Sequence, residues 1–397
     1  MKKYFIPIAS DFISQKEVDF IIRSNTEYLK NLNCEQIEFD QLLLVEQFYY
    51  FVITGGTEQQ VLALQKKRNK KFGNEDVILL AHASHNSLPA CLEVLAKLQQ
   101  DDSRGKVVYL PEAATALDAD HKPAISKIDG LPELQGLRIG SIGAPSDWLV
   151  ASSPSFEIVK QNFGIDVIPI DLNEVKQIFQ RITKEQVIDI SAAFIDKAVG
   201  IYEPSLLEIY DNIKIYLAMK KLIEKYKLDA VTIRCFDLVL DMKTTGCFAL
   251  SRLNDEGIIA GCEGDLNSTI GMLWAQKTFG KLPWMANPSQ MNLEDNSLIL
   301  AHCTVPSSLV TSYKIRSHFE SGLGVGIQGE FPKQKVTIIR IGGKNLDKIW
   351  QAEGEIIESG NAEDLCRTQI KVKLDNKYSV QDLLTNPLGN HLVVVGR

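Results

Sequence analysis

The sequence lacks several patterns that would assign the chain to a specialised class. No apolar run reaches the roughly 20 residues that a membrane-spanning helix needs, so we expect no membrane partner. The N-terminal MKKYFIPIAS has two lysines but neither a long apolar core nor a small-residue cleavage site. We interpret it as a first strand rather than a signal peptide. Internal repeats and low-complexity segments are also absent.

Cysteine spacing and net charge exclude further classes. The seven cysteines stand singly, with no CxxC pair, which argues against a zinc ribbon or a disulfide framework and favours the cytoplasm. The formal net charge of −7 argues against a nucleic-acid partner, because phosphate binding favours a basic face. What is present is an ordinary globular composition, and 397 residues are enough for two or three domains.

The order of strand-like and helix-like segments predicts the architecture. Residues 1–136 alternate the two kinds, and residues 137–303 do so again, which predicts two Rossmann-like α/β domains with parallel sheets. Short strand-like runs separated by turn residues predict an antiparallel β-rich domain, a barrel or a sandwich, over 304–397. Residues 111–136 are interpreted as an excursion at the first boundary.

One stretch of the central region concentrates polar residues at predicted strand ends. It orders a strand, a helix and a strand, at residues 257–262, 265–279 and 282–286. This order predicts a βαβ unit with two parallel strands. Ligands bind outside the carboxyl ends of such strands, so Glu263 and Asn287 are expected to face one cavity. His302 follows in the next apolar run, and an acid, an amide oxygen and an imidazole together predict a metal site.

Two loops of the first domain have more than one interpretation. Gly55-Gly56 precedes a predicted helix start, where backbone amides can hold a phosphate or a sugar hydroxyl, but the pair also suits a tight turn. In the loop 82–87, His82 and His85 stand three residues apart. They are candidates for metal binding, for contact with substrate or with a neighbouring subunit, or for plain solvation.

Four segments resemble the L-fucose isomerase and L-arabinose isomerase superfamily, and the fucose-isomerase-like group most closely. They are TGCFALSRLNDEG at 245–257, CEGD at 262–265, HC at 302–303 and GNH at 389–391. The order of two α/β domains and a β-rich domain is similar as well. The resemblance implies an aldose–ketose isomerase that uses a divalent metal, typically Mn²⁺, acts on a small sugar and assembles as a trimer or hexamer.

Carried over by position, the resemblance assigns roles in the metal site. Glu263 matches its first carboxylate, His391 its C-terminal histidine and His302 the further histidine of the arabinose type. The second carboxylate falls on Asn287, a departure, because an amide can coordinate through oxygen but cannot act as an acid or base at neutral pH. Isomerisation needs a base, an acid and an oxyanion stabiliser. Glu263 is the expected base or ligand. Asp265, Asp241, a metal-bound water or an imidazole are candidates for the other part, and Asp265 also suits the first turn of a helix, where an acid is stabilised by the helix dipole.

Sugar binding has further candidates, namely Trp284, His318 and Asn390 beside Asn287 and His302. For Trp284 the alternative is core packing, and for His318 a solvated charged loop. The sequence leaves open whether the sugar is neutral, phosphorylated or sulfonated. It also leaves open a second function, that of a sugar-binding or regulatory protein that kept the cavity and lost turnover, because Asn287 replaces a carboxylate.

Overall fold

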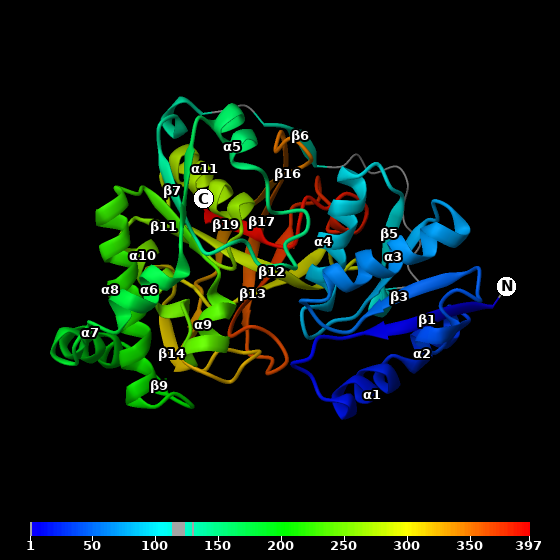
Figure 1. The fold of residues 1–397 in the computed structure, drawn as a ribbon, viewed down its shortest axis with the longest axis horizontal. Coiled ribbons are helices and arrows are strands. Elements are labelled where there is room, and N and C mark those ends of the chain that lie inside the picture. Colours follow the sequence, from blue (N-terminus) through cyan, green and yellow to red (C-terminus); the bar gives the residue numbers. More distant parts are fainter. Residues whose placement is uncertain (1, 113–123, 129–130) are drawn as a thin grey trace.

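The computed structural model describes residues 2–112, 124–128 and 131–397, so the predicted excursion at 111–136 lies partly outside the described residues. Two parallel α/β sheets and an antiparallel barrel lie side by side (Figure 1). The predicted fold class is therefore confirmed.

The N-terminal sheet has five parallel strands in the order β2-β1-β3-β4-β5. They are β1 (Lys3–Ile8), β2 (Cys34–Gln36), β3 (Phe48–Val52), β4 (Val77–Ala81) and β5 (Gly105–Tyr109). The helices are α1 (Gln15–Ser24), α2 (Thr26–Asn31), α3 (Glu58–Phe72) and α4 (Ser87–Gln100). Side chains alternate across a strand, so Phe5 and Phe51 pack with α1 and α2, whereas Ile6 and Val52 belong to the large core that includes α3 and α4.

The central sheet has four parallel strands in the order β11-β10-β7-β8. They are β7 (Arg138–Ile142), β8 (Asp166–Ile170), β10 (Ala230–Ile233) and β11 (Ile259–Gly261). Its helices are α5 (Phe156–Phe163), α6 (Leu172–Phe179), α7 (Glu185–Asp196), α8 (Leu206–Tyr226), α9 (Cys235–Met242), α10 (Cys247–Asp255) and α11 (Leu266–Phe279). A capping box between Ser205 and Glu208 fixes the start of α8.

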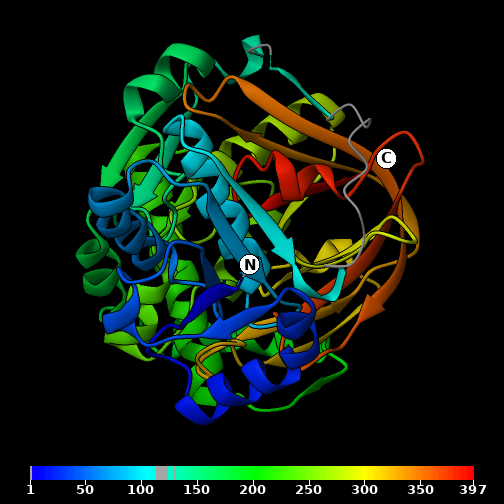
Figure 2. The same cartoon turned by 90° about the vertical axis from the view of Figure 1, so that its right-hand side faces the viewer.

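Six antiparallel strands close the barrel in the order β16-β19-β12-β13-β18-β17, because β17 pairs back with β16. They are β12 (Pro283–Asn292), β13 (Ser297–His302), β16 (Gln334–Gly342), β17 (Lys348–Gly360), β18 (Thr368–Leu374) and β19 (Leu392–Gly396). Smaller elements are β6 (Ile125–Lys127), which pairs with β17, the three-stranded sheet of β9 (Gly200–Ile201), β14 (Ser312–Arg316) and β15 (Gly326–Glu330), and α12 (Asp382–Thr385). Figure 2 shows the orange and red barrel strands beside the blue N-terminal domain.

The predicted βαβ unit is wrong in its second strand. The first strand and the helix form as β11 and α11, but β12 lies antiparallel to β13 and β19 in the barrel. An apolar run specifies a buried strand without naming its partners, and one partner of β12 is the last strand of the chain. Asn287 therefore lies within β12 rather than beyond its end. The barrel also includes two strands from the range 137–303.

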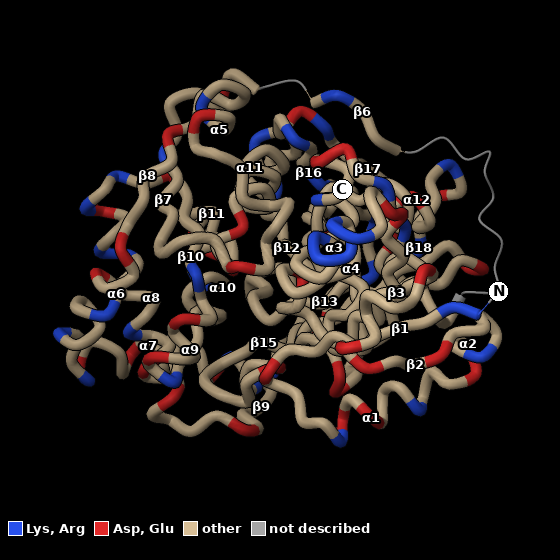
Figure 3. Tube along the Cα trace, turned by 45° about the vertical axis from the view of Figure 1, so that its right-hand side comes forward, with Lys and Arg blue, Asp and Glu red and all other residues tan. Residues whose placement is uncertain are grey.

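The distribution of charge and of apolar helices agrees with the ordinary globular composition of the sequence. Along the trace, lysines and arginines are interspersed with acidic residues (Figure 3). Within the described parts of the chain, no helix combines the length and the apolar character that crossing a membrane requires.

Candidate active site

Three neighbouring barrel strands bring Asn287, His302 and His391 together. The ladder between β12 and β19 ends with Ala286 opposite Leu392, so Asn287 and His391 stand one step beyond it. On the other side of β12, β13 ends at His302. Antiparallel register, rather than a parallel crossover, therefore places these residues at one end of the barrel.

Glu263 reaches the same place from the central sheet. It follows β11 in a tight turn with a φ of 62°, a left-handed conformation that costs a residue with a side chain about 1 kcal/mol. Gly264 has a φ of 75°, and a Cβ there would lie 2.7 Å from the Cα of Pro145. The carbonyl of Glu263 accepts the N–H of Ser146 at 2.9 Å. Backbone strain of this kind concentrates at functional sites. Here the strained turn directs the carboxylate of Glu263 towards the barrel.

Glu263, His302 and His391 form a cluster whose potential ligand atoms lie within 4.8 Å of one another. Nε2 of His391 is buried and has no hydrogen-bond partner among the described residues. It lies 3.7 Å from Oε1 of Glu263, too far for a hydrogen bond. Two imidazoles and a carboxylate are ligands typical of divalent transition metals. The orphaned nitrogen and this donor set fit a divalent metal ion.

Hydrogen bonds fix which nitrogen each histidine presents. Nδ1 of His391 lies 2.9 Å from Oδ2 of Asp265, and Nδ1 of His302 lies 2.8 Å from Oγ1 of Thr304. Both rings therefore direct Nε2 away from these partners. A carboxylate or hydroxyl behind the far nitrogen is the usual support of a metal-binding histidine.

The charges of the cluster are coupled. Burial disfavours the charged form of His391, but the negative charge of Glu263 and the hydrogen bond with Asp265 raise the pKa of His391 to about 9. Burial also opposes ionisation of Glu263, yet the charge of His391 and the hydrogen bond from Trp148 lower the Glu263 pKa. Burial and the charge of His391 lower the pKa of His302 to about 3. A metal ion at the cluster would have to displace the proton of His391.

Asp265 lies behind His391 and is fully buried. Its Oδ1 accepts the N–H of Ser268 at 2.7 Å, which confirms the helix-capping interpretation for α11. Its Oδ2 contacts His391 and, at 3.2 Å, the guanidinium of Arg340. Burial opposes ionisation, but the charge of Arg340 and the bond with His391 hold the pKa of Asp265 well below its usual range. Asp265 is thus placed to position His391.

Two buried charges that the sequence analysis missed connect this site to the first domain. Arg340 on β16 donates to Asp265 and to Ser152. Glu93 on α4 accepts from the hydroxyl of Ser152 at 2.8 Å and from the N–H of Asn390 at 2.9 Å. A signal existed, because Glu93 is the single acid in the apolar segment 88–96.

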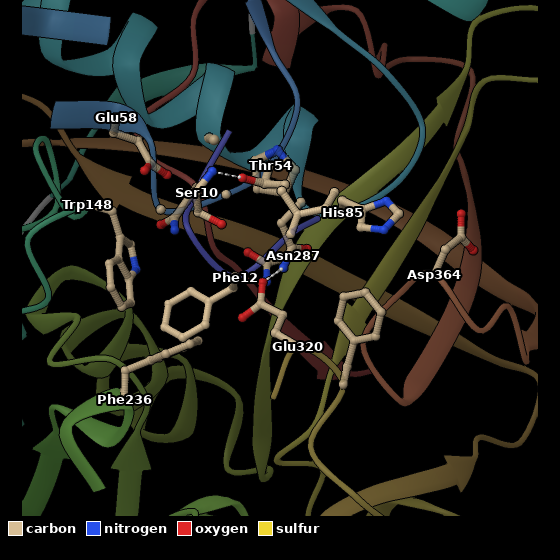
Figure 4. Close-up of a pocket in the computed structure, with 18 of the residues that line it drawn as sticks. Ser10, Phe12, Thr54, Glu58, His85, Trp148, Phe236, Asn287, Glu320 and Asp364 are labelled. Carbon is tan, nitrogen blue, oxygen red and sulfur yellow. Dashed lines mark hydrogen bonds between the residues drawn. The ribbon is translucent and has the colours of Figure 1, made fainter. Parts of the chain in front are cut away.

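A cavity of about 460 Å³ opens beside the cluster, a volume that suits a small ligand. Glu263, Asn287 and Asn390 lie on its wall, and Trp148 donates its indole N–H to Oε2 of Glu263 at 2.6 Å. Other parts of the wall come from all three regions of the chain, as Figure 4 shows for Ser10, Phe12, Thr54, Glu58, Phe236 and Glu320.

The loops of the first domain reach the cavity of their own chain. Gly55, Gly56, His85 and Asn86 line it, and the amide of Asn86 donates to Glu320 at 2.8 Å. Figure 4 shows His85 and Glu320 at this part of the wall. His82, in contrast, is buried in the domain, where its Nε2 lies 2.8 Å from the carbonyl oxygen of Ile53.

Trp284 and His318 do not belong to the cavity wall in the described structure. Trp284 is 1% exposed, and its ring centroid lies 5.1 Å from that of Phe331, so it packs in the core. His318 is buried against Phe236, with 5.5 Å between the ring centroids. The core-packing alternative holds for Trp284, and His318 lies one layer behind the wall.

The charged residues on the described cavity wall, leaving histidine aside, are all acidic. They are Glu17, Glu58, Glu263, Glu320, Glu363 and Asp364. The nearby Arg316 and Arg367 lie behind the wall and are each paired with Glu363 at 3.0 Å. The described wall therefore presents carboxyl groups, but no lysine or arginine, to a ligand.

Comparison with known proteins finds relatives named as isomerases. The chain is 23% identical over 252 residues to a sulfoquinovose isomerase of Alkalicoccus urumqiensis, a stretch covering 59% of this chain and 56% of the relative. It is 24% identical over 176 residues to the sulfoquinovose isomerases of Priestia aryabhattai and Priestia megaterium, covering 44% of this chain and 39% of each relative. The chain thus spans about half or less of the length of these curated relatives, and no family model matches it.

Proposed function

We propose that the protein is a metal-dependent isomerase that interconverts an uncharged aldose and its ketose. The observation that carries this proposal is the cluster of Glu263, His302 and His391, with an unpartnered Nε2, beside a cavity of sugar size. The names of the relatives support a sugar isomerase in general, and the family resemblance supports the choice of Mn²⁺.

The proposed metal ligands are Glu263, His302, His391 and the amide oxygen of Asn287. A divalent metal ion there supplies Lewis-acid stabilisation of the negative charge that develops on the sugar oxygens. Asp265 holds His391 in the ring orientation that leaves Nε2 free for the cluster.

Glu263 is the proposed base. Its lowered pKa leaves the carboxylate ionised at neutral pH, and the hydrogen bond from Trp148 fixes its orientation. In the proposed step the Glu263 carboxylate removes the proton from C2 of the aldose and returns it to C1. A second group must exchange protons with the two sugar oxygens, because the Asn287 amide cannot.

The substrate is proposed to be uncharged, unlike the sulfonated sugar in the name of the relatives. A sulfonate in this cavity would face carboxylates and find no lysine or arginine on the described wall. A like-charge contact at 4 Å costs about 1 kcal/mol even in water, and more in a partly dry cavity. Hydroxyl groups, in contrast, can donate to each of these carboxylates.

A second candidate function is sugar binding without turnover. Asn287 favours it, because the position that carries a carboxylate in the resembling family holds an amide here. The two functions differ in one measurable property, the exchange of the C2 proton with solvent.

Deuterium exchange tests the proposal. The protein is incubated in D₂O with Mn²⁺ and a panel of neutral, phosphorylated and sulfonated aldoses, and deuterium at C2 is followed by NMR. We expect incorporation with at least one neutral aldose, loss of incorporation after EDTA treatment, and loss in Glu263→Gln. Binding of a sugar without exchange would favour the second function, and exchange that is fastest with a sulfonated aldose would contradict the assignment of substrate charge.

A further inference from the structure

The cavity wall contains a buried carboxyl group that has no role in the site described so far. Glu58, the first residue of α3, is 2% exposed, and its Oε2 has no hydrogen-bond partner among the described residues. In Figure 4 its side chain extends from the first domain towards the space that Trp148 borders. A buried, unpartnered carboxyl oxygen costs free energy, about 1–3 kcal/mol, unless a ligand satisfies it.

The backbone around Glu58 is fixed. The hydroxyl of Thr57 donates to the carbonyl of Thr54 at 2.9 Å, and the N–H of Gly55 donates to the carbonyl of His85 at 2.9 Å. The side chain therefore projects from a rigid helix start rather than from a loose loop, as a group that acts on a substrate requires.

The other acidic residues of the wall are engaged elsewhere or exposed. Glu17 closes the capping box of α1 with Ser14, and Glu320 accepts from Asn86. Glu363 is paired with two arginines, and Asp364 is exposed. Among the described wall residues, and apart from Glu263, Glu58 is thus the carboxyl that is both buried and available to a ligand.

We propose that Glu58 is the second acid–base residue of the isomerisation, the group that Asn287 cannot supply; this inference rests on the proposed function. When Glu263 takes the proton of C2, the C–H electron pair forms the C1=C2 bond and the carbonyl pair moves to O1. Glu58 gives its proton to O1. It then takes the proton of O2 as the C2 carbonyl forms and Glu263 returns its proton to C1. Both carboxyl groups end as they began.

The electrostatic surroundings agree with the starting state of this step. Burial, reinforced by the carboxylates of Glu93, Glu263 and Glu320, raises the pKa of Glu58 well above its ordinary value. Glu58 therefore holds a proton at neutral pH while Glu263 does not. Two carboxyl groups with pKa values pushed apart are the usual basis of an acid and base pair.

The test compares Glu58→Gln, Glu58→Ala and Glu185→Gln in the presence of Mn²⁺, with the neutral aldose that the wild-type protein turns over fastest. Glu185 is the matched control, because it is likewise the first residue of a helix, α7, but is exposed to solvent. We expect Glu58→Gln to lower kcat by about 100-fold or more with little change in KM. Formate should restore part of the activity of Glu58→Ala, and Glu185→Gln should match the wild type.

A thermal melt separates this role from a structural one. Since the buried carboxyl of Glu58 is only partly hydrogen-bonded, Glu58→Gln should melt at or above the temperature of the wild type while turning over more slowly. A kcat within threefold of the wild type, a large drop in melting temperature, or no rescue of Glu58→Ala by formate would each overturn the role of Glu58 and leave the isomerase proposal standing. A wild-type protein that exchanges no C2 proton of any aldose would overturn the proposed function itself, and this role with it.

Discussion

At the scale of single residues, the proposed roles of Asn287 and Glu58 can be tested together. If Glu58 has taken over proton transfer, Asp at 287 should compensate for its loss. We predict that Asn287→Asp tightens Mn²⁺ binding about tenfold, or about 1.4 kcal/mol, because it adds a charged ligand. It should also restore part of the kcat that Glu58→Gln loses. Titration calorimetry measures the Mn²⁺ affinity, and a double-mutant cycle measures the recovery of kcat. Strictly additive effects of the two substitutions on kcat would contradict the predicted recovery.

Asp265 offers a second test at this scale. Its carboxylate balances Arg340 and His391, both of which are fully or almost fully buried. Asp265→Asn should therefore destabilise the fold by roughly 3–5 kcal/mol, as breaking a buried ion pair does. Urea unfolding measures the change, with the exposed pair of Lys97 and Asp101 as the control, where Asp101→Asn should cost little. Equal losses of unfolding free energy at the two positions would show that the buried ion pairs of Asp265 do not stabilise the fold.

At the scale of elements, the turn from β11 to α11 aims Glu263. Gly264→Ala places a Cβ against the backbone of Pro145, and backbone atoms cannot move aside as a flexible side chain can. The matched control is Gly257→Ala, because Gly257 also has a positive φ, of 84°, but has no atom within 4 Å of a built Cβ. We predict a cost of about 1 kcal/mol for Gly257→Ala. Gly264→Ala should cost more and also weaken Mn²⁺ binding, as unfolding and titration experiments can measure.

Comparable Mn²⁺ affinity in the two glycine variants would contradict this interpretation of the turn.

The local nature of such turns also explains what the sequence could predict. Strands such as Arg138–Ile142 and Gln334–Gly342 lie within the regions where strand-like runs are expected, because period and turn chemistry are local properties. The pairing of β12 with β19 was not predictable in this way, since β19 lies about 100 residues further along the chain.

The candidate site likewise contains residues that local sequence signals predict and residues that they do not. Glu263 and His391 carry motif signals, and the structure brings them within 3.7 Å of each other. Glu58, Glu93 and Arg340 carry no motif. They stand out by burial and by contacts between distant segments, which a single sequence does not state beyond the lone acid in the apolar segment around Glu93. Trp284 shows the converse, because an aromatic residue close to a motif is still most often part of the core.

At the scale of the whole molecule, the site joins all three regions of the chain. Glu93 comes from the first domain, Asp265 from the central domain, and Arg340 and His391 from the barrel. Hydrogen bonds connect these residues in series. Ser152 links Glu93 to Arg340, and Asp265 links Arg340 to His391. A ligand that binds the native cluster should therefore stabilise the whole protein rather than one domain.

The protonation of His391 gives this coupling a pH dependence. Its pKa is raised from 6.5 to about 9, so the stability that its charge contributes is fully present below pH 6.5 and is lost as the pH rises through about 9. Mn²⁺ competes with the same proton, so its affinity should increase over that window. We therefore predict that the melting temperature falls with pH in EDTA, while the gain on adding Mn²⁺ grows. Calorimetry between pH 6.5 and 9 measures both, with His391→Gln as the control that should show little of either. A gain from Mn²⁺ that is constant with pH would mean that His391 is not a ligand, because a metal that leaves the imidazolium in place has no proton to displace.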